Sequence, residues 1–252
     1  MSSTVRRNVF LVFGAGLAVL LLWSFGGLPD FGHYAGPYGD ILNASSIPER
    51  QTTAVVSAIN FDYRGFDTLG EEFILFAAVM GVTLLLRSQR GEDEEEGSLR
   101  ERGDLREAGD TSDAVRIASL GLIGPAVLLG LYVIAHGHLT PGGGFQGGVV
   151  LTAAPLLLFV AGRYLLLRTV HPMHALDLVE GAGAGGFVVL GLAGLAAASA
   201  YLANFIGLGQ VGSVFSGGTL PVLNLLVGLE VMAGVTLVLY EFLEQTLVMR
   251  ER

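Results

Sequence analysis

Residues 136–150 read HGHLTPGGGFQGGVV and place two histidines, one proline and six glycines between two long apolar runs. Pro141 cannot continue a helix, and the glycines that follow it allow backbone conformations with positive φ. We therefore expect a helix, a tight turn and a second helix. Gly144 and Gly148, four residues apart, predict close backbone packing of that second helix. Gly181 and Gly185 repeat this spacing in a later apolar run.

The same stretch satisfies the pattern G-x-G-x-x-G at Gly142, Gly144 and Gly147. In dinucleotide-binding proteins that pattern follows a β-strand inside a βαβ unit. Here a long apolar helix is predicted before it, so we expect no nucleotide site. Two interpretations stay open for the turn: close helix packing, or direct contact with an ion.

Composition predicts a membrane protein. Of the 252 residues, 52% are hydrophobic and 15% are charged, whereas soluble domains carry about 25% charged residues. Apolar runs long enough to cross a bilayer recur along the chain, so we expect an all-α polytopic membrane protein. The net charge of −9 argues against nucleic acid as a partner. Cysteine and lysine are absent, which excludes thiolate, Schiff-base and intramembrane-lysine chemistry.

Six membrane helices are expected, with a long polar connection at 28–70 that carries a short surface helix near 51–60. The predicted helices span residues 8–28, 69–86, 114–135, 147–167, 178–203 and 220–242. Arginine-rich and arginine-poor loops alternate along this order, which predicts that both termini are cytoplasmic.

Charge divides the chain into three parts. Residues 91–113 form an acidic run that we interpret as a solvated cytoplasmic linker. It separates a two-helix module at 1–90 from a four-helix module at 114–252.

A second unusual stretch, DYRGFDTLGEE at 62–72, precedes the second predicted helix. Thr68 and Glu71 have the spacing of a capping box, in which each side chain binds a free backbone N–H at the start of a helix. That interpretation accounts for Glu71 but leaves Glu72 unexplained.

The glycine-rich stretch resembles the signature of the MnhB/MrpB family, one of the subunit families of Mrp-type sodium/proton antiporters. The matching positions are His138, Thr140, Pro141, Gly142, Gly143, Gly144, Phe145, Gly147 and Gly148. Residues 216–224, SGGTLPVLN, resemble the start of that family's last helix. The second stretch resembles the small E subunit of membrane-bound hydrogenases and the C-terminal part of the MrpA family. Its motif positions are Asp62, Arg64, Gly65 and Asp67.

These resemblances imply a fusion of the two modules in a non-catalytic multi-pass subunit of the prokaryotic inner cell membrane, without a cofactor. Its implied partners are membrane lipid and the other membrane subunits of an Mrp-type antiporter, with Na⁺ and H⁺ as candidate ions. The alternative host is the membrane arm of a group 4 hydrogenase-like respiratory complex.

Glu230 stands in the middle of the last apolar run, where an acidic side chain costs about 2.5–3.5 kcal/mol on insertion scales. Glu241 lies three turns further on the same helix face. Such a residue marks an ion path or serves as a buried strut, and the sequence leaves both interpretations open. The other candidates for the ion path are Glu71, Glu72, His136 and His138.

Two further chemistries are not expected. His136 and His138 could form a metal site only with His171 and His174, yet a predicted spanning helix separates the pairs by roughly 30 Å. A stand-alone intramembrane enzyme would need converging nucleophile, base or metal ligands at one depth, and the sequence predicts none. We therefore expect neither a metal nor enzymatic activity.

Overall fold

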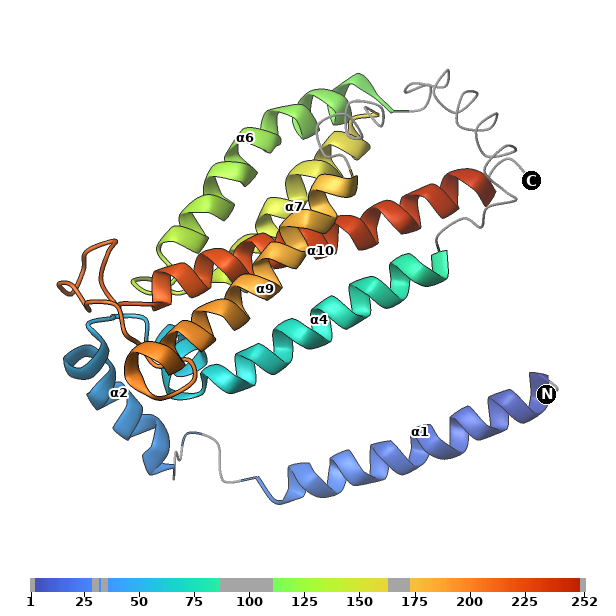
Figure 1. The fold of residues 1–252 in the computed structure, drawn as a ribbon. Coiled ribbons are helices and arrows are strands. Elements are labelled where there is room, and N and C mark those ends of the chain that lie inside the picture. Colours follow the sequence, from blue (N-terminus) through green and yellow to red (C-terminus); the bar gives the residue numbers. More distant parts are fainter. Residues whose placement is uncertain (1–2, 29–31, 33–35, 87–110, 163–172, 250–252) are drawn as a thin grey trace. The chain divides into compact units, whose positions relative to one another are not determined.

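The computed structural model describes residues 3–28, 32, 36–86, 111–162 and 173–249, and within these ranges its regular structure is helical throughout (Figure 1). The chain divides into two compact units, Met1–Ile41 and Leu42–Arg252. Most of the acidic linker predicted at 91–113, and His171, lie outside the described residues. The helices are α1 (Ser3–Gly26), α2 (Pro37–Arg50), α3 (Val55–Ala58), the π-helix η1 (Ile59–Tyr63), α4 (Gly65–Leu86), α6 (Asp113–Ala135), α7 (Gly144–Val160), α9 (Met173–Ala198) and α10 (Leu220–Met249).

The first unit contains α1, whose predicted membrane span is confirmed as an apolar helix. Its segment Arg7–Gly26 is long and apolar enough to cross a membrane, and none of it is buried inside the protein. Phe13 and Trp23 are more than 70% exposed. An apolar helix with this much free surface needs lipid or another membrane protein around it.

The second unit is organised around α10, which packs against α4, α7, α9 and, less extensively, α6 (Figure 1). In α10, 56% of the apolar segment is buried, whereas the corresponding share is 28% in α9 and lower in the other candidate spans. Val227, Val231 and Leu237 are almost fully buried on its packed faces. The last helix is therefore the core of the unit, and the other helices keep an apolar outer face for the membrane.

The prediction of an all-α polytopic membrane protein is confirmed. Five described helices have the length and composition of membrane spans: α1, α4, α6, α9 and α10. The fourth predicted span corresponds to α7, which is apolar but only 17 residues long, from Gly144 to Val160.

Glycines set the distance between α7 and α10, as the sequence predicts. A Cβ atom on Gly144 would lie 2.6 Å from the carbonyl oxygen of Asn224, and one on Gly148 would lie 2.8 Å from that of Gly228. Real Cβ atoms do not approach so closely, so only glycine permits this packing. Gly147 lies on the neighbouring face of α7 that packs against α6, where an added Cβ would lie 2.8 Å from the carbonyl oxygen of Gly130.

Gly181 and Gly185 make no close contact within this chain, because a Cβ at either position would meet nothing within 4 Å, so their close packing stays a prediction. The glycine that brings α9 against α10 is Gly183. A Cβ there would lie 2.7 Å from Cβ of Glu230 and 2.8 Å from the carbonyl oxygen of Leu226. Small residues do bring the two helices together, but the buried face of α9 is rotated away from the predicted one.

The capping box is also wrong. The chain runs from η1 almost directly into α4, which begins at Gly65, so Thr68 and Glu71 lie inside the helix rather than at its start. The Thr68 hydroxyl donates to the carbonyl of Asn60 at 2.6 Å, and Glu71 is exposed. Residues of the connection predicted at 28–70 form α2 and α3 as well as η1.

Replacing Gly183 by Ala is expected to destabilise the α9–α10 contact by about 1–3 kcal/mol, because the added methyl group meets backbone atoms that cannot move aside. The thermal unfolding midpoint of the purified membrane complex should fall. Gly185→Ala is the matched control on the same helix and should leave the midpoint unchanged. Equal midpoints for the two variants would contradict this packing.

The orientation predicted from the arginines can be tested in the cysteine-free chain. Gln210 and Asp113 are both exposed. Gln210 lies between α9 and α10, whereas Asp113 is the first residue of α6. A cysteine at Gln210 should react with a membrane-impermeant thiol reagent added to whole cells, and one at Asp113 should react only after lysis. The reverse pattern would overturn the prediction of cytoplasmic termini.

Candidate functional site

The turn between α6 and α7 is fixed by Asn224, a fully buried residue of α10. Its side-chain oxygen accepts from the Gly144 backbone N–H at 2.9 Å. Its amide nitrogen donates to the Ser57 hydroxyl at 3.1 Å and to the Leu220 carbonyl at 3.0 Å. This one side chain therefore joins the glycine-rich turn to both α3 and α10.

Residues 52–54 cover the other side of this turn. The carbonyl of His138 accepts hydrogen bonds from the Thr52 hydroxyl and, at 3.2 Å, from the Ala54 N–H. Gly142 and Gly143 have φ of +135° and +146°, which residues with a side chain rarely adopt. The contacts therefore favour the packing interpretation of the turn over direct contact with an ion.

The two histidines of the motif have different surroundings. His136 stacks on Tyr132, with ring centroids 4.2 Å apart. His138 is fully buried, and its Nε2 lies 3.4 Å from the carbonyl oxygen of Ser213 in the segment between α9 and α10. Burial lowers the pKa of His138 below its usual value of 6.5. No group of three metal-ligating side chains occurs among the described residues.

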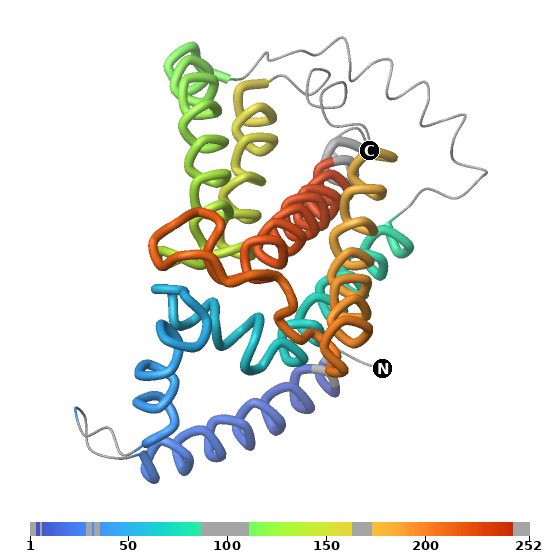
Figure 2. Tube along the Cα trace, turned by 60° about the vertical axis from the view of Figure 1, so that its left-hand side comes forward, coloured from blue at the N-terminus to red at the C-terminus, as the bar shows by residue number. Residues whose placement is uncertain are grey.

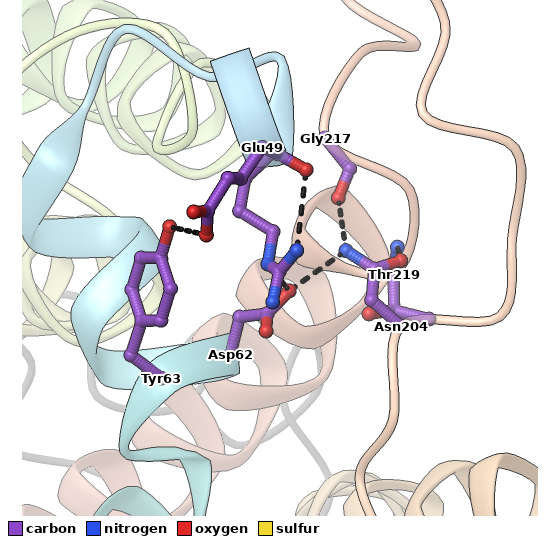
Figure 3. A network of polar contacts seen from close by, with 7 residues as sticks. Glu49, Asp62, Tyr63, Asn204, Gly217 and Thr219 are labelled. Carbon is purple, nitrogen blue, oxygen red and sulfur yellow. Dashed lines mark hydrogen bonds and ion pairs between the residues drawn. The ribbon is translucent and has the colours of Figure 1, made fainter. Parts of the chain in front are cut away.

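A polar network ties the segment between α9 and α10 to η1, which precedes α4 (Figure 3). Asp62 forms an ion pair with Arg50 at 2.8 Å and accepts from the Asn204 amide at 3.1 Å. Asn204 also donates to the Gly217 carbonyl at 3.0 Å and accepts from the Thr219 N–H at 2.9 Å. Figure 2 shows the segment before α10 crossing this end of the helices. Asp62 therefore connects the second motif to the start of α10.

The remaining motif residues play smaller parts. Tyr63 donates to Glu49 at 2.9 Å, and burial together with that hydrogen bond raises the pKa of Tyr63 to about 12. Arg64 and Asp67 form an ion pair between exposed side chains, which contributes little to stability. Gly65 packs against Leu202, whose Cδ1 would lie 3.3 Å from an added Cβ.

Three buried carboxyl groups meet between α4, α9 and α10. Glu72, Glu180 and Glu230 are 1%, 2% and 0% exposed. The carboxyl groups of Glu72 and Glu230 are close enough to influence each other, and Glu180 is close enough to Glu230 to interact through its charge. We call these three residues the carboxyl cluster. A pair of carboxyl groups so close together can hold one shared proton or one cation between them.

The structure brings together only two of the predicted ion-path residues, Glu72 and Glu230. Glu71 is exposed beside them, and Glu241 is buried further along α10. Sequence reasoning misses Glu180, because near the start of a helix an acidic residue is explained by the helix dipole alone. Glu180 precedes Gly183 by three residues, so the two lie on one face of the helix. Gly183 lies on the face that α9 buries against α10, and this spacing could have indicated that Glu180 is buried.

Residues 114–237 match the family model described as a domain related to the MnhB subunit of Na⁺/H⁺ antiporters. An uncharacterised protein of Methanocaldococcus jannaschii is 32% identical over 194 residues, covering 72% of this chain and 73% of that protein. A protein of Rhizobium meliloti, described as the probable A/B subunit of a K⁺/H⁺ antiporter, is 30% identical over 142 residues, which are 50% of this chain and 14% of that longer protein.

Two solved structures share the fold. A chain of the membrane-bound sulfane sulfur reductase, an archaeal respiratory membrane complex, superposes with a TM-score of 0.71 at 28% identity, covering 95% of this chain and 98% of that one. A chain of the Mrp complex from Dietzia sp. superposes with a TM-score of 0.68 at 23% identity, covering 96% of this chain and 26% of that one.

The fold and these matches define an integral membrane protein of the kind found in multisubunit membrane complexes. The chain belongs to the family of proteins with a domain related to the MnhB subunit of Na⁺/H⁺ antiporters. The predicted resemblance to the MnhB/MrpB family is confirmed, while the fusion with an E-like module and the three-part division stay predictions.

Acid is expected to loosen the contact between His138 and the segment before α10. The pKa of His138 is lowered in the folded protein. His138 therefore binds a proton more readily when its contact with the segment is open. Stability is therefore unaffected well above pH 6.5 and falls as the pH drops through that value. Hydrogen exchange, corrected for its intrinsic pH dependence, should show less protection of residues 208–217 in mild acid. Unchanged protection would contradict the buried neutral imidazole, and His138→Gln, which cannot be protonated, should show no such change.

Proposed function

We propose that the chain is a non-catalytic membrane subunit of a multisubunit Mrp-type antiporter that exchanges a cation for protons across the prokaryotic inner cell membrane. The family match, the similarity to a probable K⁺/H⁺ antiporter protein and the fold shared with the Mrp complex support this proposal. The free apolar surface of α1 and of the outer helix faces fits membrane lipid and neighbouring subunits.

An ion-path role is supported mainly by the closeness of Glu72 and Glu230, which are buried between the helices. Both carboxyl groups are buried, and neither has a hydrogen-bond donor from another residue within the described part of the chain. Isolated charge at this depth is costly, and ionisable residues inside membranes mark proton or ion pathways. A purely structural pair would instead be expected to have donors that satisfy its oxygen atoms.

Glu230→Gln is expected to leave the complex assembled, because the amide keeps the shape of the side chain and can hydrogen-bond to Glu72. It should abolish most of the ion gradient formed by membrane vesicles, because an amide neither carries charge nor transfers a proton at this site. Assembly is checked on native gels. Normal gradients from a fully assembled Glu230→Gln variant would contradict the ion-path role.

Glu230→Leu separates the ion path from a structural strut. As a strut, Glu230 would tolerate Gln but not Leu, which leaves the partner group unpaired at a cost of about 1–3 kcal/mol. As part of an ion path, Glu230 tolerates neither substitution in the gradient assay.

A second host complex is favoured by one comparison. The archaeal respiratory membrane complex contains a chain of matching length, with 98% of that chain covered. Purification of the native complex decides between the hosts: large soluble subunits with metal clusters indicate a respiratory complex, and their absence indicates an antiporter.

A further inference from the structure

We infer that the carboxyl cluster carries protons rather than a dehydrated metal cation, and that Glu180 connects the Glu72–Glu230 pair to the protein surface beside Asp177. This inference rests on the proposed ion-path function and specifies the ion and the direction of access. It assigns a transport role to Glu180, which is not among the ion-path candidates predicted from the sequence.

The geometry places Glu180 one turn further along α10 than the pair. A Cβ atom on Gly234 would lie 3.2 Å from Oε1 of Glu180, whereas Gly183 of α9 meets Glu230 itself. Gly234 follows Glu230 by four residues, or about 6 Å along the helix. The carboxyl groups therefore form a step along α10, with Glu72 and Glu230 at one level and Glu180 at the next.

The carboxyl oxygens of the cluster need hydrogen-bond partners that the described residues do not supply. Both carboxyl oxygens of Glu72, both of Glu230 and Oε1 of Glu180 are buried without a hydrogen-bond partner. Glu72 comes from α4, Glu180 from α9 and Glu230 from α10. Three separate helices therefore contribute to the carboxyl cluster. Buried polar atoms in native proteins are normally satisfied, and a proton placed between two carboxyl groups satisfies two of them at once.

The charged neighbours of the cluster lead from Glu180 to the exposed Asp177. Within the described ranges, the further charged groups that act on the three are acidic: Glu71 beside Glu72, and Asp177 beside Glu180. Asp177 is exposed and precedes Glu180 by three residues, so the two side chains lie on the same face of α9. It stands in the second turn of α9, which begins at Met173. Protons can therefore enter or leave at this end of α9.

The surroundings suit a proton better than Na⁺ or K⁺. Hard cations require a shell of several oxygen ligands held at fixed distances. No group of three acidic or histidine side chains could hold a metal ion among the described residues. Gly183 and Gly234 are packed tightly against side chains, with added Cβ atoms meeting Glu230 Cβ at 2.7 Å and Val79 Cγ2 at 3.0 Å. The α9–α10 and α4–α10 contacts beside the carboxyl groups are therefore close-packed.

The transfer itself is balanced without a co-reactant. A protonated carboxyl group of Asp177 or Glu180 gives its proton to the neighbouring carboxylate, and becomes a carboxylate that the next proton refills. One O–H bond breaks while another forms, and no electrons are transferred.

The inference is tested on the assembled complex with a hydrophobic carbodiimide, which reacts with protonated carboxyl groups in apolar surroundings. Labelling should be found by peptide mass spectrometry at Glu72, Glu180 or Glu230, should decrease as the pH is raised, and should not change when Na⁺ or K⁺ is added at constant pH. Protection by either cation at constant pH would overturn the assignment of the proton.

Glu180→Gln tests the connection. Gradient formation should be lost as in Glu230→Gln, whereas Asp113→Asn, which removes an exposed carboxylate at the start of α6, should behave as the wild type. An assembled Glu180→Gln complex with normal gradients beside an inactive Glu230→Gln complex would overturn the role of Glu180 alone. Normal gradients in both would overturn the proposed function. If Glu180→Gln does not assemble, labelling of the wild-type complex still decides which ion the cluster holds.

Discussion

The burial of three carboxyl groups, with no basic partner among the described residues, is the constraint on which the rest of the structure depends. A carboxylate removed from water must gain a proton, a cation or hydrogen-bond donors, and the described residues offer Glu72 and Glu230 no hydrogen-bond donor. Such an arrangement costs stability, so the surrounding helices must hold it in place. Central α10 provides that support, because α4, α7 and α9 all pack against it.

Glycines allow the helices to pack closely against α10, and hydrogen bonds fix the positions of the connecting segments. Gly144, Gly148 and Gly183 let backbone or side-chain atoms of α10 approach where a Cβ would clash. Asn224 locks the glycine-rich turn to the start of α10, and Asn204 ties the preceding segment to Asp62. The two sequence motifs are therefore anchors at one end of the helices, while the chemistry that we propose lies deeper. The contacts described for both motifs are close packing and hydrogen bonds.

Much of the fold could be predicted from the sequence, because apolar runs of spanning length have few alternatives in a membrane. The helix at Pro37–Arg50 could not, since a polar stretch with three prolines reads as a loop until Leu42 and Ser46 are seen to be buried. The site was predicted in part. Glu230 is conspicuous in its apolar run, whereas Glu180 lies near a helix start and only the rotation of α9 reveals that it faces inward. Rotation about a helix axis cannot be derived from an apolar run that has no polar face.

The most direct test of this view is an experimental density map of the native complex around α4, α9 and α10. We expect the carboxyl groups of Glu72, Glu180 and Glu230 to converge there, with no basic side chain of a neighbouring subunit among them. An arginine or lysine of a partner inserted between these carboxyl groups would contradict this expectation. The cluster would then be a set of buried ion pairs that holds the complex together, and the ion would have to cross elsewhere.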